Sequence, residues 1–317
     1  MKRYIKKILK VALYPFIYLN NCVKDTNWYK NSIPNLENYP GNDWYRKHNE
    51  RNYDVVNIGS SSALYAFDYS EIGLKAFNWA LQPQSMEYSF KVLKNYFSIL
   101  KKNGIVIIPF CPFSGLSVDG KWSESSYGRY YHILDYTLID NYKRINSYRR
   151  WPLIYQPKQS IKRLIKDVPR NKSGKSYNVC HNDMEFEQDA QKWIDNWMTQ
   201  FNIKDLDSPK SKENIEGASH RMKIMKNMID FCIERDLRPV IVIPPMHHTL
   251  VEKLNKTFRE NYIYSFIKEL NIYDIPFYDY MDNKNFNDNS YFYNAYFMNP
   301  KGAKAFTNDL LNKLDII

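Results

Sequence analysis

The sequence is poor in the motifs that hold cofactors. It has only 10 glycines among 317 residues, and none of them forms a phosphate-binding loop, so we expect no nucleotide cofactor. It shows no HExxH or comparable pattern of histidines and carboxylates, so we expect no metal. Zinc-finger and RRM signatures are also missing, which argues against a nucleic-acid partner.

Cysteine is scarce and scattered. The four cysteines lie far apart, with no CxxC pair and no metal-ligand spacing: Cys22, Cys111, Cys180 and Cys232. Two of them, Cys111 and Cys232, fall in segments that we predict to be buried. We therefore expect free thiols in a reducing compartment, and hence a cytoplasmic location.

Long apolar runs are absent as well. The N-terminal stretch MKRYIKKILKVALYPFIYL has about a dozen apolar-leaning residues with Lys10 among them, whereas a spanning helix needs roughly 20. It lacks the small-residue cleavage site of a signal peptide. On a helix, lysines fill one face and the other collects Ile5, Ile8, Leu9, Ala12 and Leu13. Residues 1–30 are thus predicted to be a basic amphipathic segment, which either contacts a membrane surface through residues 1–20 or docks on the protein's own body.

Positive charge and aromatic side chains are abundant. The net charge is +11, concentrated at the N-terminus and in residues 143–175. Basic surfaces attract phosphates, anionic lipids or acidic polymers, although a solvated surface explains the charge equally well. Aromatics make up 16% of the chain, with 27 tyrosines, which supply a core and can also line a carbohydrate-binding surface.

Strand-like stretches alternate with helical ones. The predicted strands are Tyr53–Ile58, Ala76–Ala80, Ile105–Phe110, Pro239–Ile243 and Pro276–Tyr280. The predicted helices run from about 88 to a C-cap at Gly104, and over about 218–236, 248–270 and 301–314. This alternation indicates an α/β fold, with a parallel sheet covered by helices on both faces.

Residues 115–217 interrupt the alternation with aromatic and basic clusters. We predict a largely helical insertion there, over the site edge, with a flexible segment near 169–178. The predicted organisation is therefore an N-terminal segment, 1–30, followed by an α/β domain over 50–317 that carries this insertion.

The segments that follow the predicted strands should meet at one edge of the sheet. Ligands of parallel sheets bind at the carboxyl ends of the strands. We therefore expect five segments to crowd that edge: 60–62, 82–85, 112–114, 244–248 and the residues from Tyr280 onward.

The first of these segments has the form of a nucleophile turn. Gly59 permits a tight strand-to-helix turn, and the serines after it could present a hydroxyl beside backbone N–H groups that hold an oxyanion. The alternative is that a serine simply caps the next helix.

Four stretches carry a family resemblance: NIGSSSALYAFD (57–68), AFNWALQPQSMEYSFKVLKNY (76–96), VIVIPPMHH (240–248) and FYNAYFMNPKGAKAF (292–306). In order and spacing the chain resembles the SGNH/GDSL hydrolase superfamily, and most of all the branch found in bacterial surface-polysaccharide and teichoic-acid loci. The resemblance implies a three-layer α/β/α sandwich with a parallel, flavodoxin-like five-stranded sheet. It also implies an esterase or O-acyltransferase acting on a cell-surface polysaccharide.

The resemblance assigns roles to residues near the first two strands. Ser61 takes the nucleophile position, two places after Gly59. Oxyanion or substrate contacts map to Gly59, Asn78 and Gln84. Ordinary loop polar residues remain the alternative for the two amides.

The last block departs from the family pattern D-x-x-H-x-N-x-x-G-A. Asn299, Gly302 and Ala303 match it, but Asn294 stands at the Asp position and Phe297 at the His position. Phenylalanine cannot accept a proton, so the usual activation of serine is lost. The alternative to an active enzyme is a catalytically inactive SGNH-like protein that binds a glycan or a partner.

Other histidines are candidate substitutes for the missing base. His247 and His248 follow the fourth predicted strand on the site edge, although they could instead cap or flank a helix that starts near Thr249. His132 and His181 lie in the insertion, and neither has a readable partner.

Overall fold

The computed structural model describes residues 2–32, 51–116, 128–167, 177–271 and 273–317, with side chains from residue 13 onward. The chain divides into two compact units. The first, called here the N-terminal unit, comprises Met1–His48 and Lys121–Gly174; the second, the sheet unit, comprises Asn49–Gly120 and Lys175–Ile317. The segment 115–217 is therefore shared between the two units.

A five-stranded parallel sheet forms the centre of the sheet unit. Its strands are β1 (Tyr53–Asn57), β2 (Ala76–Asn78), β3 (Leu100–Pro109), β4 (Arg238–Ile243) and β5 (Phe277–Asp279). They lie in the order β2-β1-β3-β4-β5, and each neighbouring pair is parallel. This is the flavodoxin-like order, so the predicted sheet is confirmed.

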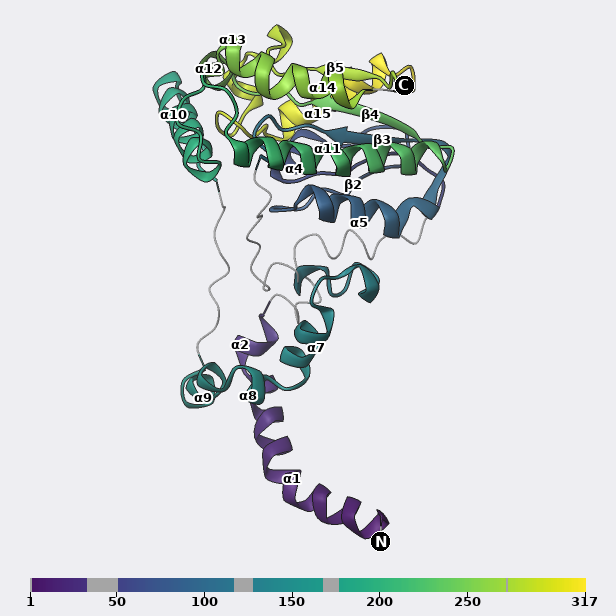
Figure 1. Cartoon of the computed structure of the whole chain (residues 1–317), viewed down its shortest axis with the longest axis vertical. Helices are drawn as coiled ribbons and strands as arrows, with labels where there is room; N and C mark the ends of the chain where they lie inside the picture. Colours follow the sequence, from purple (N-terminus) through teal and green to yellow (C-terminus); the bar gives the residue numbers. More distant parts are fainter. Residues whose placement is uncertain (1, 33–50, 117–127, 168–176, 272) are drawn as a thin grey trace. The chain divides into compact units, whose positions relative to one another are not determined.

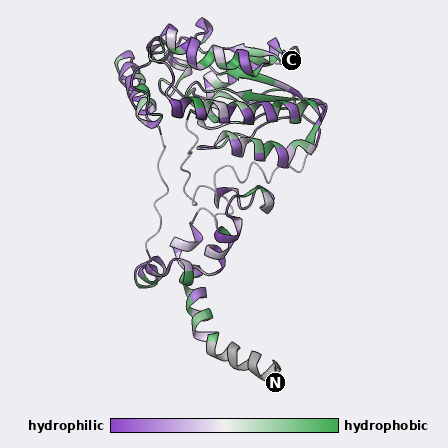
Figure 2. Ribbon diagram, in the orientation of Figure 1, coloured by the Kyte–Doolittle hydropathy of each residue, from purple (hydrophilic) through white to green (hydrophobic). Residues whose placement is uncertain are grey.

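Helices cover both faces of the sheet (Figure 1). On one face, α4 (Ser61–Ala66) and α15 (Pro300–Lys313) share a buried core with alternate residues of β1, β3 and β4, such as Val55, Ile107 and Val242. On the other, α11 (Lys212–Ile233) packs on β4 and lies against α5 (Met86–Tyr96) and α14 (Ser265–Leu270). Figure 2 shows the hydrophobic strands between helices of mixed polarity. The predicted three-layer α/β/α sandwich is confirmed.

The helix predicted to end at Gly104 is shorter than expected. α5 ends at Tyr96, a 3₁₀ turn, η2 (Phe97–Ile99), follows, and β3 starts at Leu100. Asn103 takes a positive φ of 62°, and a Cβ on Gly104 would lie 2.9 Å from the Lys101 carbonyl oxygen. The C-cap prediction was therefore wrong, because Gly104 lies inside a strand and permits a close backbone approach.

The helix predicted over 248–270 is broken into pieces. These are α12 (His248–Lys253), α13 (Lys256–Phe258), the π-helical η5 (Arg259–Tyr264) and α14. Asn255 N-caps α13, since its side chain accepts a hydrogen bond from the Phe258 amide at 2.8 Å. A side chain that bonds to the backbone in this way starts a new helix where the apolar pattern predicted continuity.

The helices within residues 115–217 are divided between the two units. α10 (Asp183–Gln200) packs on α12 within the sheet unit. The helix expected near 218–236 is α11, which begins earlier, at Lys212. Of the segment 169–178 that we predicted to be flexible, all but residues 177 and 178 lie outside the described residues.

The N-terminal unit is helical in the parts that are described. It contains α1 (Lys2–Asp25), α2 (Asn27–Lys30), η3 (Gly128–Tyr130), η4 (Tyr136–Leu138), α7 (Tyr142–Arg150), α8 (Pro152–Tyr155) and α9 (Pro157–Ile165). The predicted N-terminal helix is thus present as α1. Within the described ranges, no helix combines the length and apolarity that crossing a bilayer requires.

Candidate functional site

The turn after β1 requires glycine at its first position. Gly59 has a φ of +132°, and a Cβ there would lie 2.6 Å from the Cβ of Ala63. Ser60 follows at the N-cap position of α4, and its Oγ accepts a hydrogen bond from the backbone amide of Gln84 at 3.1 Å. The turn therefore places three successive serines at the start of a helix, above the carboxyl end of β1.

The Gln84 side chain braces this turn. It is 5% exposed, and its Nε2 donates to the Gly59 carbonyl at 2.9 Å and lies 3.2 Å from the Ser89 hydroxyl. The side-chain amide nitrogen of Gln84 thus already donates hydrogen bonds within the protein. The oxyanion role that the resemblance gives to Gln84 stays a prediction, and its observed contacts are those of a structural brace.

Asn78 plays a similar part at the other end of α4. Its Nδ2 lies 3.1–3.3 Å from the carbonyl oxygens of Ala63, Leu64 and Phe67, which are the last turn of the helix. Its Oδ1 accepts from the Asn57 side chain at 2.8 Å. Asn78 therefore caps the carboxyl end of α4 from strand β2, while Gln84 fixes the turn at the other end.

Segments that follow three different strands meet at the edge of the sheet. One small hollow, of about 30 Å³, is lined by Gly59, Ser60, Ser62, Gln84 and Cys111, among others. It lies where the loops after β1 and β3 diverge, the switch point of this strand order, where ligands of such sheets bind. The predicted crowding of segments 60–62, 82–85, 112–114 and 244–248 is confirmed by the lining of this hollow and its neighbour.

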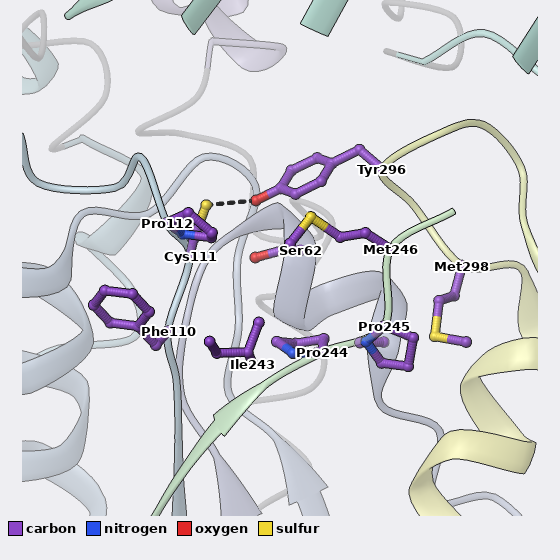
Figure 3. A pocket seen from close by; sticks show the side chains of 11 residues that line it. Ser62, Phe110, Cys111, Pro112, Ile243, Pro244, Pro245, Met246, Tyr296 and Met298 are labelled. Carbon is purple, nitrogen blue, oxygen red and sulfur yellow. Dashed lines mark hydrogen bonds between the residues drawn. The ribbon is translucent and has the colours of Figure 1, made fainter. Parts of the chain in front are cut away.

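Three polar side chains gather in the neighbouring hollow, of about 10 Å³ (Figure 3). The Cys111 Sγ lies 2.7 Å from the Tyr296 hydroxyl, and the Ser62 hydroxyl is also hydrogen-bonded to Tyr296. Burial raises the pKa of the Cys111 thiol, and it raises the pKa of Tyr296 well above its usual value. Both groups therefore stay protonated near neutrality, and neither serves as a base or as an anionic nucleophile.

All four cysteines are unpaired by disulfides, as predicted. Cys232 is buried on α11, and Cys180 is buried three residues before α10 begins. Among the described residues, no group of three histidine, cysteine or acidic side chains could hold a metal ion.

Phe297 packs on Tyr65 of α4. Ser61 is the first residue of the helix and is half-buried, and Tyr65, one turn later, shares its face. The Tyr65 ring centroid is 4.7 Å from that of Phe297, which is 2% exposed and also packs against Trp193 at 5.4 Å. The position that the resemblance assigns to a base is thus filled by a ring inside an aromatic cluster.

Asn294 shapes the loop that carries Phe297. Its Oδ1 accepts from the backbone amides of Tyr296 at 3.0 Å and Phe297 at 2.8 Å, and its Nδ2 donates to the Asn178 carbonyl at 3.1 Å. The residue is 1% exposed. At the position that the resemblance assigns to an Asp, this side chain therefore fixes a turn.

His247 is fully buried in a different setting. Its Nδ1 lies 2.9 Å from the Thr249 hydroxyl, its Nε2 lies 2.9 Å from Asn289 Oδ1, and its ring stacks on Phe186 at 4.0 Å. Burial lowers the pKa of His247 to about 4. It N-caps α12, which confirms the capping interpretation, and both ring nitrogens are already bonded.

The other three candidate histidines have different surroundings. His248 is half-buried, and its ring centroid lies 4.3 Å from that of His247. His181 is exposed just before α10, where its backbone amide donates to Glu185 at 2.8 Å. His132 belongs to the N-terminal unit.

A wider groove opens beside the last block. Its volume is about 390 Å³, and its lining consists of Tyr177, Asn178, Asp189, Lys192, Trp193, Asn196 and Asn294. Asp189 Oδ2 accepts from the Ala295 amide at 3.2 Å, and Asp189 is also hydrogen-bonded to Trp193. Burial raises the pKa of Asp189, although both hydrogen bonds oppose the rise.

The sequence carries a signal for this groove that we did not use. Asp189, Lys192, Trp193 and Asn196 are spaced i, i+3, i+4 and i+7, which places them on one face of α10. The sequence pattern of residues 115–217 predicts only a helical insertion there.

Comparison with known proteins does not identify the chain further. No protein-family model matches it, and no curated protein is significantly similar to it. The sheet edge, the serine turn and the groove beside α10 are therefore the basis for any functional assignment.

Proposed function

We propose that this chain is an SGNH-hydrolase-like protein that does not perform serine-hydrolase chemistry and that binds a glycan in the groove beside α10. The observation that carries the proposal is the environment of Phe297. At the position that the resemblance assigns to the base, a buried phenyl ring packs against Tyr65 and Trp193.

The surrounding chemistry supports the loss of catalysis. A serine nucleophile needs a neighbouring base that accepts its proton. His247 keeps both ring nitrogens bonded to Thr249 and Asn289, and Cys111 and Tyr296 are protonated. Losing one member of a catalytic triad typically lowers the rate by several orders of magnitude.

The groove has the composition that sugar binding requires. The half-buried ring of Trp193 offers an apolar surface for the C–H face of a pyranose, and its indole N–H is fixed by Asp189. Exposed side chains of Asn178, Lys192 and Asn196 line the same groove and can bond to hydroxyl or acidic groups of the ligand. Its volume of about 390 Å³ lies within the range of small-ligand sites.

Labelling with a fluorophosphonate probe tests the catalytic half of the proposal. We expect no labelling of the folded wild-type protein, and none of Ser61→Ala or of the matched variant Ser62→Ala. Labelling that disappears in Ser61→Ala but persists in Ser62→Ala would refute the proposal. It would establish the alternative, an esterase or O-acyltransferase of a cell-surface polysaccharide with another base for Ser61.

A glycan array, followed by titration of the best ligand, tests the binding half. Replacing the aromatic surface in Trp193→Ala should weaken binding at least tenfold, because it removes most of the apolar contact. Tyr273→Ala is the matched control, since Tyr273 is an exposed aromatic residue of the sheet unit that does not line the groove. Equal binding by both variants, or no glycan bound by the wild type, would contradict the proposed groove.

A further inference from the structure

Helix α9 buries a polar side chain and exposes apolar ones, the opposite of a helix that packs on a hydrophobic core. Ser160 is fully buried, and its hydroxyl donates to the Pro152 carbonyl at 2.9 Å. Ile161, Leu164 and Ile165 are spaced i, i+3 and i+4, and they are 53%, 36% and 83% exposed. We call these three residues the α9 outer face. An apolar helix face turned away from its own unit indicates an external partner.

The reversal is fixed by contacts within the N-terminal unit. Asp167, just after α9, accepts from the backbone amides of Asn27 at 2.8 Å and Trp28 at 3.3 Å, which open α2. On α1, Asn20 Nδ2 donates to the Arg150 carbonyl at 3.2 Å, and Tyr29 of α2 donates to the Arg149 carbonyl at 2.6 Å. The outer face of α9 is therefore presented by a helical body that its own hydrogen bonds hold in place.

The exposed apolar residues of the chain are concentrated in this unit. Of 17 large hydrophobic side chains that are exposed among the described residues, 11 belong to it. On α1 they include Leu13, Tyr14, Ile17 and Tyr18, and on α8 they include Ile154 and Tyr155. The sheet unit, although much larger, has only six. The asymmetry shows that apolar exposure is a property of the N-terminal unit.

Positive charge accompanies the apolar face. Between Tyr142 and Lys166 the chain has 8 basic residues and no aspartate or glutamate. Lys158 and Lys162 on α9, and Lys166 at its C-cap, are exposed and flank the outer face. Isoleucine and leucine beside lysines are the composition of helices that lie in a membrane interface, where acyl chains accept the apolar side chains and anionic headgroups attract the basic ones.

We propose that the α9 outer face, together with its flanking lysines, binds the surface of a membrane that contains anionic phospholipids. This contact is separate from the one expected for residues 1–20, since it rests on a different helix. It is also independent of the groove in the sheet unit. Nucleic acid would match the charge but not the three apolar side chains, which is why a lipid surface is the partner that fits both features.

The test is co-sedimentation of the full chain with vesicles. One set consists of phosphatidylcholine alone and the other of equal parts phosphatidylcholine and phosphatidylserine. We expect the wild type to bind the second set and not the first. Removing three charges in Lys158→Gln, Lys162→Gln, Lys166→Gln should weaken binding roughly a hundredfold. The variant Ile161→Ser, Leu164→Ser, Ile165→Ser should weaken it by about tenfold or more.

A matched control separates this face from general apolar exposure. Ile215→Ser, Ile233→Ser alters two exposed isoleucines of α11 in the sheet unit and should bind like the wild type. Circular dichroism checks that every variant is folded. Three results would overturn the proposal: a wild type that ignores both vesicle sets, α9 variants that bind like the wild type, or a loss that follows the lysines but not the apolar residues.

Discussion

Burial of His247 makes the stability of the sheet unit depend on pH. The histidine is fully buried and neutral, with a pKa of about 4 against 6.5 for an ordinary histidine. Between these two values the unfolded chain binds a proton that the folded chain refuses, so stability falls as the pH falls. Above pH 6.5 neither state is protonated and the full stability is present.

The magnitude follows from the size of the pKa difference. A difference of about 2.5 units, at 1.36 kcal/mol per unit, corresponds to roughly 3 kcal/mol between pH 6.5 and pH 4. Other groups titrate in the same window, so the quantity to measure is the difference between the wild type and His247→Gln. This difference should shift by roughly 3 kcal/mol against the wild type as the pH falls through the window.

Urea unfolding followed by tryptophan fluorescence measures this difference at each pH. The slope of the unfolding free energy against urea concentration should be compared between variants, since a chain with two units can unfold in more than one step. His220→Gln is the control, because His220 is exposed on α11 and its loss should leave the pH dependence of the wild type unchanged. If the stability difference between the wild type and His247→Gln is constant from pH 6.5 to pH 4, the reasoning from burial is refuted.

Two substitutions test the frame around the serine helix, both read out as shifts in thermal unfolding. Gly59→Ala should cost more than about 2 kcal/mol, because its Cβ would meet Ala63 at 2.6 Å and its φ is positive, whereas Gly73→Ala, with nothing within 4 Å, should be nearly neutral. Asn78→Leu should cost roughly 2–4 kcal/mol, because it removes the side-chain hydrogen bonds to the Leu64 and Phe67 carbonyls and the bond from the Asn57 side chain; a loss below about 0.5 kcal/mol would show that water replaces these bonds.

Much of the fold was readable because its signals are local. Runs such as those of β3 and β4 are continuous and rich in β-branched residues, which only a strand buried on both faces explains. The two helix errors came from single residues, Gly104 and Asn255. A Cβ on Gly104 would lie 3.3 Å from the Tyr53 carbonyl oxygen, and Asn255 caps a new helix. The spacing of apolar residues carries neither piece of information.

The sequence predicts the location of the candidate site better than the contacts of its side chains. Topology alone brings Ser60–Ser62 and Gln84 to one edge, because parallel strands end on the same side. The resemblance also predicts that Phe297 stands where a base would be expected. It could not show that Gln84 and Asn78 direct their amides at backbone carbonyls, nor that Asp189 and Trp193 meet the last block, since these partners are set by packing over long sequence separations.

The cap that Asn78 places on α4 has a consequence for how the protein opens and closes locally. A six-residue helix is too short to persist alone, because its few internal hydrogen bonds do not offset the entropy of ordering it. Its last carbonyls are held by a side chain of the edge strand β2, so the helix and that strand cannot come apart independently. Residues 59–78 thus form one cooperative opening unit, and the amide protons of α4 and β2 should exchange with solvent at a common opening free energy.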